Sequence, residues 1–388
     1  MGLRERWDDM SQTERGVTGS LAAVLGLLLV AVLLGRLQPA YLVFLVSLGG
    51  MFSLLSLGLN AQWGFTGLIN FSVAAFFGIG AYGTALMTSD SSPIAGGFHP
   101  IVGLGVAVAL AVVLAILIGI PTLRLRADYL AIASLGLAEV VRLVALNERQ
   151  WTNGDAGVRG VPEFFTGFPI LDGLPATLPG FRVEIVPGSP FFLEGAFYRE
   201  LLTLLLVVLF LGAVYLVLHR AHRSPWGRVL RTIRSDEDLA KALGKNTYWY
   251  KMQSFVLGSV IMALGGVFGA HLINFVAPGN IEPIWTFYVW VAVMLGGSGS
   301  TRGALLGGFV VVAVREGPRQ LNNLGQLPFD AAPLRLMFIG VIIILLMNYR
   351  PQGILPPQRE LIWPGTVDER PSELDTGVRE ARGGGGDE

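Results

Sequence analysis

Long apolar stretches alternate with short polar ones along most of the chain. A helix needs about 20 mostly apolar residues to span a membrane. The apolar stretches lie near residues 20–37, 41–59, 67–87, 100–120, 129–146, 201–218, 253–275, 284–297, 303–315 and 333–348. This pattern predicts an all-α, polytopic membrane protein with about 8–10 transmembrane helices. The short, Gly-flanked stretches at 284–297 and 303–315 are candidates for half-helices or a re-entrant pair.

Positive charges in the connecting loops orient these helices, because short cytoplasmic loops are rich in Lys and Arg. Residues 219–252 and 121–128 carry such charges, whereas 88–99 and 276–283 carry none. The alternation predicts that the N-terminal segment 1–19 and the C-terminus both lie in the cytoplasm of a multi-pass protein of the cell membrane.

The same reading divides the chain into parts. A transmembrane domain covers 20–350 and contains an external loop at 147–199, which is long enough to pack as a cap. The tail 351–388 is rich in Pro, Gly and acidic residues, so we expect it to be disordered. The loop near 316–335 carries Arg residues on the predicted external side, a conflict that disappears if 303–315 is re-entrant.

Composition excludes several classes of function. Only 14% of the 388 residues are charged, against about 25% in soluble domains. The formal net charge is +0 and there is no Cys, which rules out disulfides and thiolate chemistry. No phosphate-binding G-x-x-x-x-G-K-[ST] loop occurs, and His219 and His222 have no third metal ligand nearby. We therefore predict no catalytic residue, no metal site and no energy source within the chain.

The stretch 58–82, GLNAQWGFTGLINFSVAAFFGIGAY, combines apolar residues with amides and many glycines. Irregular backbone persists in a membrane only where it is buried in protein or lines a water-filled cavity. Its polar side chains either line a path for a polar solute or form hydrogen bonds that hold helices together. The candidate path residues are Asn60, Gln62, Thr66, Asn70 and Ser72.

Two opposite charges fall within another apolar stretch, YLAIASLGLAEVVRLVALN. Glu139 and Arg142 are three residues apart and so share one helix face, near the middle of the bilayer. An ionisable residue at that depth indicates a functional site by default. The alternative is a mutually neutralised structural pair, because a proton relay would more readily use an unpaired carboxylate.

The loop RSPWGRVLRTIRSDEDLAKALGKNTYWYKMQ predicts two short helices. Ser224 caps the first, with Pro225 at its first position. Ser235 begins a capping box for the second, and Gly244 ends it. Such a loop suits docking into a groove of another protein, or alternatively lying on anionic lipid. The docking candidates are Arg234, Asp236, Glu237, Asp238, Ala240, Ala242 and Gly244, in which the small alanines allow close approach.

Several motifs also resemble those of a known family. The run DLAKALG, 238–244, resembles the Glu-Ala-Ala-x-x-x-Gly loop of ABC importer permeases, with Leu239 departing from the Ala-Ala pair. Three further segments resemble the corresponding segments of LivM-type branched-chain amino-acid permease subunits. They are the 58–82 stretch, YLAIASLGLAEVVRLV and TNGDAGVRGVP. The likeness runs from about Gly58 to Pro351.

This resemblance implies an ABC importer transmembrane-domain fold and a transporter subunit that is not itself an enzyme and binds no cofactor. ATP would be used by two partner ABC ATPase subunits, and the further partners would be a related permease subunit and an external solute-binding protein. The implied cargo is leucine, isoleucine or valine, moved by alternating access. Two alternatives stay open: a urea or short-chain amide permease, and an ion-coupled secondary amino-acid transporter, which needs no docking helix.

Overall fold

The computed structural model describes residues 37–183, 191–323 and 352–356, and the single positions 32, 337, 340, 341, 344 and 348. Contacts divide the chain into Met1–Pro356 and Pro357–Glu388, and only the first contains described residues. The predicted N-terminal segment 1–19, most of the predicted helices at 20–37 and 333–348, and most of the predicted tail lie outside the described residues.

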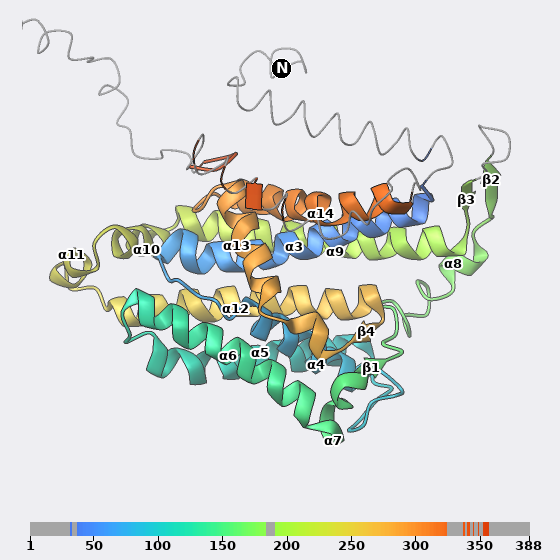
Figure 1. The fold of residues 1–388 in the computed structure, drawn as a ribbon, viewed down its shortest axis with the longest axis horizontal. Coiled ribbons are helices and arrows are strands. Elements are labelled where there is room, and N and C mark those ends of the chain that lie inside the picture. Colours follow the sequence, from blue (N-terminus) through green and yellow to red (C-terminus); the bar gives the residue numbers. More distant parts are fainter. Residues whose placement is uncertain are drawn as a thin grey trace, which may run out of the picture. The chain divides into compact units, whose positions relative to one another are not determined.

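The described part of the first unit is helical, which confirms the all-α prediction (Figure 1). Five of its helices are long and apolar enough to cross a membrane, including the 26 residues from Pro39 to Gly64. The remaining apolar helices are shorter or more polar. The bundle helices are α3 (Pro39–Leu59), α4 (Val73–Thr88), α5 (Pro100–Thr122), α6 (Ala127–Asn147), α9 (Gly195–Arg223), α12 (Thr247–Ile273), α13 (Ile284–Gly296) and α14 (Thr301–Asn323).

Several helix boundaries differ from the sequence prediction. α14 runs for 23 residues, so the prediction of a short segment at 303–315 is wrong. Its charged C-terminal half resembles a loop in hydropathy, yet backbone hydrogen bonding continues the helix through it. α4 begins only at Val73, because the preceding residues 67–72 form no regular structure, and α9 begins at Gly195 rather than at 201.

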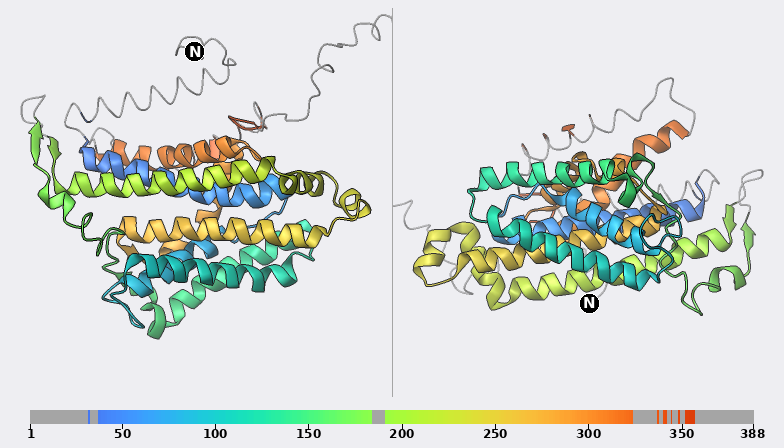
Figure 2. Two further views of the ribbon diagram at one scale, coloured as in Figure 1. Left: turned by 180° about the vertical axis from the view of Figure 1, so that it is seen from behind. Right: turned by 90° about the horizontal axis from the view of Figure 1, so that it is seen from below.

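Helix α12 lies in the middle of the bundle, where it packs on α3, α4 and α5, while α3 also packs on α9 and α14 (Figures 1 and 2). The crossing of α3 and α12 is close at Gly58 and Gly258. A Cβ atom on Gly258 would lie 2.5 Å from the carbonyl oxygen of Gly58, and one on Gly58 would lie 2.7 Å from that of Gly258. Only glycines permit this approach, as in other membrane helix pairs.

Short elements follow α6 and precede α13. They pack around the adjacent ends of the bundle helices, with Val158, Val161 and Phe164 buried. Two small antiparallel pairs form, with Val158 opposite Val276 and with Phe181 opposite Leu193. The elements are α7 (Arg149–Thr152), η2 (Gly154–Ala156), β1 (Val158–Arg159), α8 (Leu174–Thr177), β2 (Phe181–Val183), β3 (Phe191–Leu193), β4 (Phe275–Val276) and η3 (Pro278–Ile281).

The opposite ends of α9 and α12 are joined by α10 (Pro225–Ser235) and α11 (Glu237–Ala242). Both figures show α11 beyond the ends of the neighbouring long helices (Figures 1 and 2). The first residues of the predicted tail are also placed. Residues 352–356 lie against the turn between α13 and α14, where the N–H groups of Ile354 and Leu355 donate to the carbonyls of Leu295 and Gly296.

Candidate functional site

Helix α3 changes to a π-helix, η1 (Asn60–Gly64), before the chain becomes irregular at 67–72. Gln62 lies at the centre of the hydrogen bonds that hold this irregular segment. Its Nε2 donates to the carbonyl oxygen of Phe255 (2.8 Å) and to Oγ of Ser259 (3.1 Å), and its Oε1 accepts from Nδ2 of Asn70 (2.6 Å). The backbone then turns at Gly67, whose φ of 78° favours glycine.

The other predicted path residues join the same buried network. Oγ1 of Thr66 donates to Oγ of Ser254 on α12 (2.7 Å). Oδ1 of Asn70 accepts from both N–H and Oγ of Ser72. The structure therefore brings these residues together by bonding them to one another and to α12, an arrangement that fits the helix-holding interpretation.

Asn60 connects η1 to the other irregular segment of the bundle. Its Oδ1 accepts a hydrogen bond from the N–H of Gly299, in the turn between α13 and α14 (2.8 Å). Its buried Nδ2 has no hydrogen-bond partner among the described residues. One amide donor of the network is thus left free.

The partners of this network on α12 were not apparent from the sequence. Ser254 and Ser259 are fully buried, and their signal in the sequence was weak, because single serines in an apolar helix are common. The indole N–H of Trp290 likewise donates to the carbonyl oxygen of Asn70 (3.0 Å), a contact that no local pattern indicated.

The Glu139–Arg142 pair on α6 forms a two-point ion pair. Nε of Arg142 lies 2.9 Å from Oε2 of Glu139, and Nη2 lies 2.5 Å from Oε1. Both carboxylate oxygens are therefore occupied by the guanidinium. This geometry supports the interpretation of a neutralised structural pair, and no hydrogen bond joins it to the network of Gln62 in the described part of the chain.

Helix α10 begins as the sequence predicted. The N–H of Gly227 donates to Oγ of Ser224 (3.4 Å), and Pro225 occupies the first turn. Its apolar face packs onto the bundle, where Leu230 and Ile233 are buried. The helix is thereby fixed to the transmembrane helices.

The predicted cap of α11 is wrong by one residue. Asp236, and not Ser235, accepts from the N–H of Leu239 (2.9 Å). Ser235 is still helical, and its hydroxyl donates to the carbonyl of Thr232 in α10. Because α10 extends through Ser235, the next residue with an acceptor side chain becomes the cap.

The surface of α11 also differs from the prediction. Ala240 is 1% exposed and packs against its own chain, so it offers no surface for close approach by a partner. Leu239 and Leu243 are instead 51% and 65% exposed. Gly244 ends the helix with φ 74°, as predicted, and has open space around it. Leu239 in α11 and Leu243 at its C-terminal end thus form a small apolar surface beyond the ends of the long helices.

Arg234 links α10 to both irregular segments of the bundle. Its Nη1 donates to the carbonyl oxygen of Gly64, at the end of η1. Its Nη2 donates to Oγ of Ser298, in the turn between α13 and α14 (3.0 Å). That turn contains Gly297 and Gly299 at positive φ, as expected for a tight helix break. Arg234 was predicted as a docking residue, and its contacts with Gly64 and Ser298 were not predicted.

Glu237, the first residue of α11, connects the same region to α12. It forms an ion pair with Lys251 and accepts from Oγ1 of Thr247 (3.0 Å). Burial would raise the pKa of Glu237, but the hydrogen bond and charge of Lys251, aided by Thr247 and Lys241, outweigh it and hold the pKa below its ordinary value. The carboxylate is therefore charged at neutral pH.

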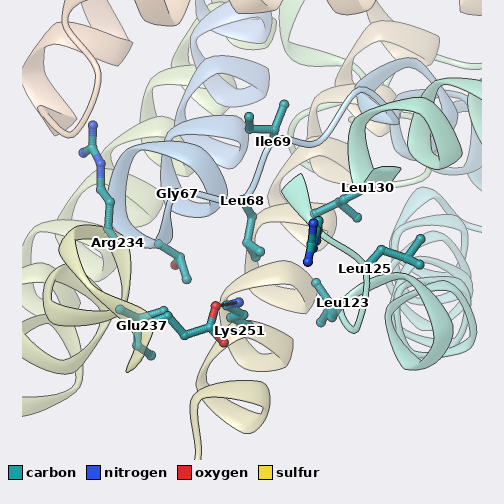
Figure 3. A pocket seen from close by; sticks show the side chains of 12 residues that line it. Gly67, Leu68, Ile69, Leu123, Leu125, Leu130, Arg234, Glu237 and Lys251 are labelled. Carbon is teal, nitrogen blue, oxygen red and sulfur yellow. Dashed lines mark hydrogen bonds and ion pairs between the residues drawn. The ribbon is translucent and has the colours of Figure 1, made fainter. Parts of the chain in front are cut away.

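A cavity of about 180 Å³ lies beside these groups (Figure 3). Its wall is formed by the irregular segment after η1, the α5–α6 connection, α6, α10, α11 and α12. The lining residues are Thr66, Gly67, Leu68, Ile69, Leu123, Leu125, Arg126, Leu130, Ile233, Arg234, Glu237 and Lys251. In the described part of the chain, no group of three or more His, Asp or Glu side chains is placed to hold a metal ion.

Comparisons with known proteins agree on one family. The family described as "Branched-chain amino acid transport system / permease component" matches residues 41–347. The high-affinity branched-chain amino acid transport system permease protein LivM of Escherichia coli is 32% identical over 315 residues, which cover 80% of this chain and 68% of that protein. The probable LivM of Methanocaldococcus jannaschii is 28% identical over 351 residues, with 81% and 93% covered. No solved structure gives a significant match.

Proposed function

This chain belongs to the family of branched-chain amino acid permease components, and on that premise we propose that it is the membrane-spanning subunit of an ABC importer. It carries leucine, isoleucine or valine across the cell membrane by alternating access. Its N- and C-termini and α10–α11 face the cytoplasm. Hydrolysis of ATP by partner subunits supplies the energy, and the chain needs no cofactor of its own.

The observation that carries the proposal is the position of Arg234. Its guanidinium holds the carbonyl of Gly64 and the hydroxyl of Ser298, so a displacement of α10 acts on η1 and on the α13–α14 turn together. At both places the described bundle backbone departs from the α-helix, and such backbone depends on contacts with its neighbours to satisfy its polar groups. A force applied to α11 therefore has a short route into the transmembrane core.

The docking surface for an ATPase is α11. Its exposed Leu239 and Leu243 supply apolar contact area, while Asp238 and Lys241 at its polar surface are exposed. Lipid contact is the competing use of this helix, and it would favour a longer continuous apolar face. The six residues of α11 fit a groove in a protein better than a bilayer surface.

Two further partners complete the proposed assembly. A related permease subunit forms a heterodimer with this chain, and an external solute-binding protein delivers the amino acid to the face formed by β1 to β3. The solute path runs along the segment from Asn60 to Ser72. The free Nδ2 donor of Asn60 supports this, because a buried donor without a partner favours a passing acceptor such as a carboxylate.

Reconstitution of the chain with its sister permease, two ATPases and the solute-binding protein tests the proposal. We expect leucine uptake into vesicles only with ATP on the cytoplasmic side. Uptake of leucine by the chain alone on a proton or sodium gradient would refute the ABC assignment in favour of a secondary transporter. Uptake of urea or a short-chain amide in place of leucine would refute the proposed cargo.

A pair of exposed-residue variants tests the docking surface. Leu243→Asp places a charge on α11 and should abolish co-purification of the ATPase subunits. Ile170→Asp, at a position 81% exposed in the loop on the opposite side, is the matched control and should retain them. Gly244→Trp should likewise uncouple ATP hydrolysis from uptake while membrane insertion is preserved. Retained ATPase binding and uptake in Leu243→Asp would show that α11 is not the docking helix.

A further inference from the structure

The cavity beside α10 and α11 is lined by both aliphatic and charged side chains (Figure 3). The proposed coupling of α10 to the transmembrane helices does not need this combination. One part of its wall is aliphatic, and the other part carries charged side chains. The aliphatic residues are Leu68, Ile69, Leu123, Leu125, Leu130 and Ile233. Both chemistries thus line one partly open cavity.

Its size restricts what it can hold. Pockets for drug-sized ligands measure ~300–1,000 Å³, whereas an engineered apolar cavity of ~150 Å³ holds one benzene molecule. The volume of about 180 Å³ therefore suits one small solute that is slightly larger than benzene. A valine or leucine molecule belongs to that size class.

The charged residues of the wall differ in whether they already have hydrogen-bond or ion-pair partners. Arg234 is engaged by Gly64 and Ser298, and Lys251 is paired with Glu237. The guanidinium of Arg126 has no hydrogen-bond or ion-pair partner among the described residues, although it lines the cavity. A guanidinium binds a carboxylate through two parallel hydrogen bonds, so Arg126 is available for an anionic group.

Glu237 provides the complementary charge. Its side chain is 34% exposed. Oε1 accepts from Thr247 and lies 3.5 Å from Nζ of Lys241, and Oε2 pairs with Lys251. Because each carboxylate oxygen can accept two hydrogen bonds, one acceptor position on Oε2 stays open for a ligand. A carboxylate and a free guanidinium on the wall of a small aliphatic cavity match a zwitterion with an aliphatic side chain.

We propose that this cavity is a second amino-acid site, open to the cytoplasmic side, for one short branched aliphatic amino acid. Arg126 binds its carboxylate, Glu237 binds its ammonium group, and the aliphatic wall surrounds its side chain. The proposal rests on the proposed function for the orientation of the chain and for the supply of the ligand, which is the imported amino acid itself.

Binding at this position affects transport because the cavity wall contains parts that must move. Glu237 begins α11, and Thr66 to Ile69 follow directly after η1. A ligand that contacts both α11 and the segment after η1 stabilises the conformation in which the two are close. It shifts the population toward that conformation by as much as its affinity for the two conformations differs. Amino acid accumulated in the cytoplasm therefore slows further uptake.

A binding measurement tests the site directly. The assembled permease–ATPase complex in detergent, without the solute-binding protein, is dialysed against labelled leucine. We expect saturable binding that Arg126→Gln weakens at least tenfold. Arg124→Gln is the matched control, because Arg124 lies over the ring of Tyr248 and does not line the cavity, and it should bind as the wild type does. Equal affinity in Arg126→Gln and Arg124→Gln would overturn the site.

A ligand comparison tests the role of Glu237. The 2-oxo acid of leucine keeps the carboxylate and the side chain but lacks the ammonium group. We expect it to bind several-fold more weakly than leucine. Equal binding of the two compounds would refute the ammonium contact.

Vesicles test the consequence for transport. Right-side-out vesicles are preloaded with ATP and increasing unlabelled leucine, and initial uptake is divided by the uptake of the same variant without preloaded leucine. We expect this ratio to fall several-fold in the wild type and to stay near one in Arg126→Gln and in the cavity-filling variant Leu130→Phe. Equal inhibition in all three would refute the proposal.

The two proposals fail in different ways. Absence of ATP-dependent leucine uptake in the wild type contradicts the proposed function, and the dialysis experiment then still decides whether the cavity binds leucine. Normal uptake with a ratio that preloading leaves unchanged contradicts only the cytoplasmic site.

Discussion

Replacing Arg234 with glutamine removes the link between α10 and the irregular segments of the bundle. The guanidinium makes one hydrogen bond to Gly64 and one to Ser298. A hydrogen bond from a charged donor contributes about 1.5–3 kcal/mol, and the lower value applies because the Arg234 side chain is partly exposed. Two such bonds amount to about 3 kcal/mol, which corresponds to about a 100-fold change in the coupling equilibrium.

The assay measures uptake and ATP hydrolysis in the same reconstituted vesicles. In Arg234→Gln we expect ATP hydrolysis to continue while the leucine transported per ATP hydrolysed falls by about one to two orders of magnitude. Ser298→Ala removes only one of the two bonds and should cause about a tenfold loss. The reason is that the ATPases still close, but the movement of α10 no longer reaches η1 and the α13–α14 turn.

Arg228 supplies the control for loss of charge. It lies on the same helix and is exposed, and in the described structure its side chain makes no hydrogen bond or ion pair. Arg228→Gln should leave the transport-to-hydrolysis ratio unchanged. If Arg234→Gln and Arg228→Gln transport equally well per ATP hydrolysed, the link does not transmit the movement of α10 and the reasoning is refuted.

Three further variants test the packing and the charges, each by thermal unfolding of the purified complex. Gly258→Ala introduces a Cβ atom 2.5 Å from the carbonyl oxygen of Gly58 and should lower the free energy of unfolding by about 1–3 kcal/mol. Gly136→Ala, whose Cβ atom would meet no atom within 4 Å, should leave it unchanged. Equal melting temperatures of the two variants would contradict the close crossing of α3 and α12. Glu139→Gln should destabilise the complex more than the joint change with Arg142→Gln, because the single change leaves an unpaired charge. An equal loss of stability in both would contradict a mutually neutralised pair. The folded-state pKa of Glu237 is lowered, so the wild type should be more stable than Glu237→Gln. This stability difference should be fully present above the ordinary pKa of 4.5 and disappear as pH falls further. A difference that persists at lower pH would refute the ion pair.

Much of the architecture was predictable because its causes are local. The length of an apolar stretch decides whether a helix can span a membrane. This identified the bundle helices α3 to α6, α9, α12 and α13, with ends that differ from the structure by up to six residues. The start of α10 at Ser224 and Pro225 and the end of α11 at Gly244 follow from cap preferences that involve only neighbouring residues. The polar residues of 60–72 were also recognisable, because amides are rare in apolar stretches.

The failures arose where one segment depends on another. Asp236 caps α11 only because α10 continues through Ser235, and Ala240 is buried only because the chain folds back on itself. α14 was predicted too short because the charged residues of its C-terminal half lower the hydropathy, although the helical backbone hydrogen bonds continue there.

The sequence by itself therefore determined that this is a helical membrane protein of the permease family, where most of its helices lie and which residues are chemically unusual. Only the tertiary structure decided what those residues contact. Arg234 meets Gly64 across 170 positions of the chain, and the cavity wall is assembled from separate stretches of the chain that lie between Thr66 and Lys251. Hydropathy and capping act over a few residues, whereas the choice of a distant partner depends on the packing of whole helices.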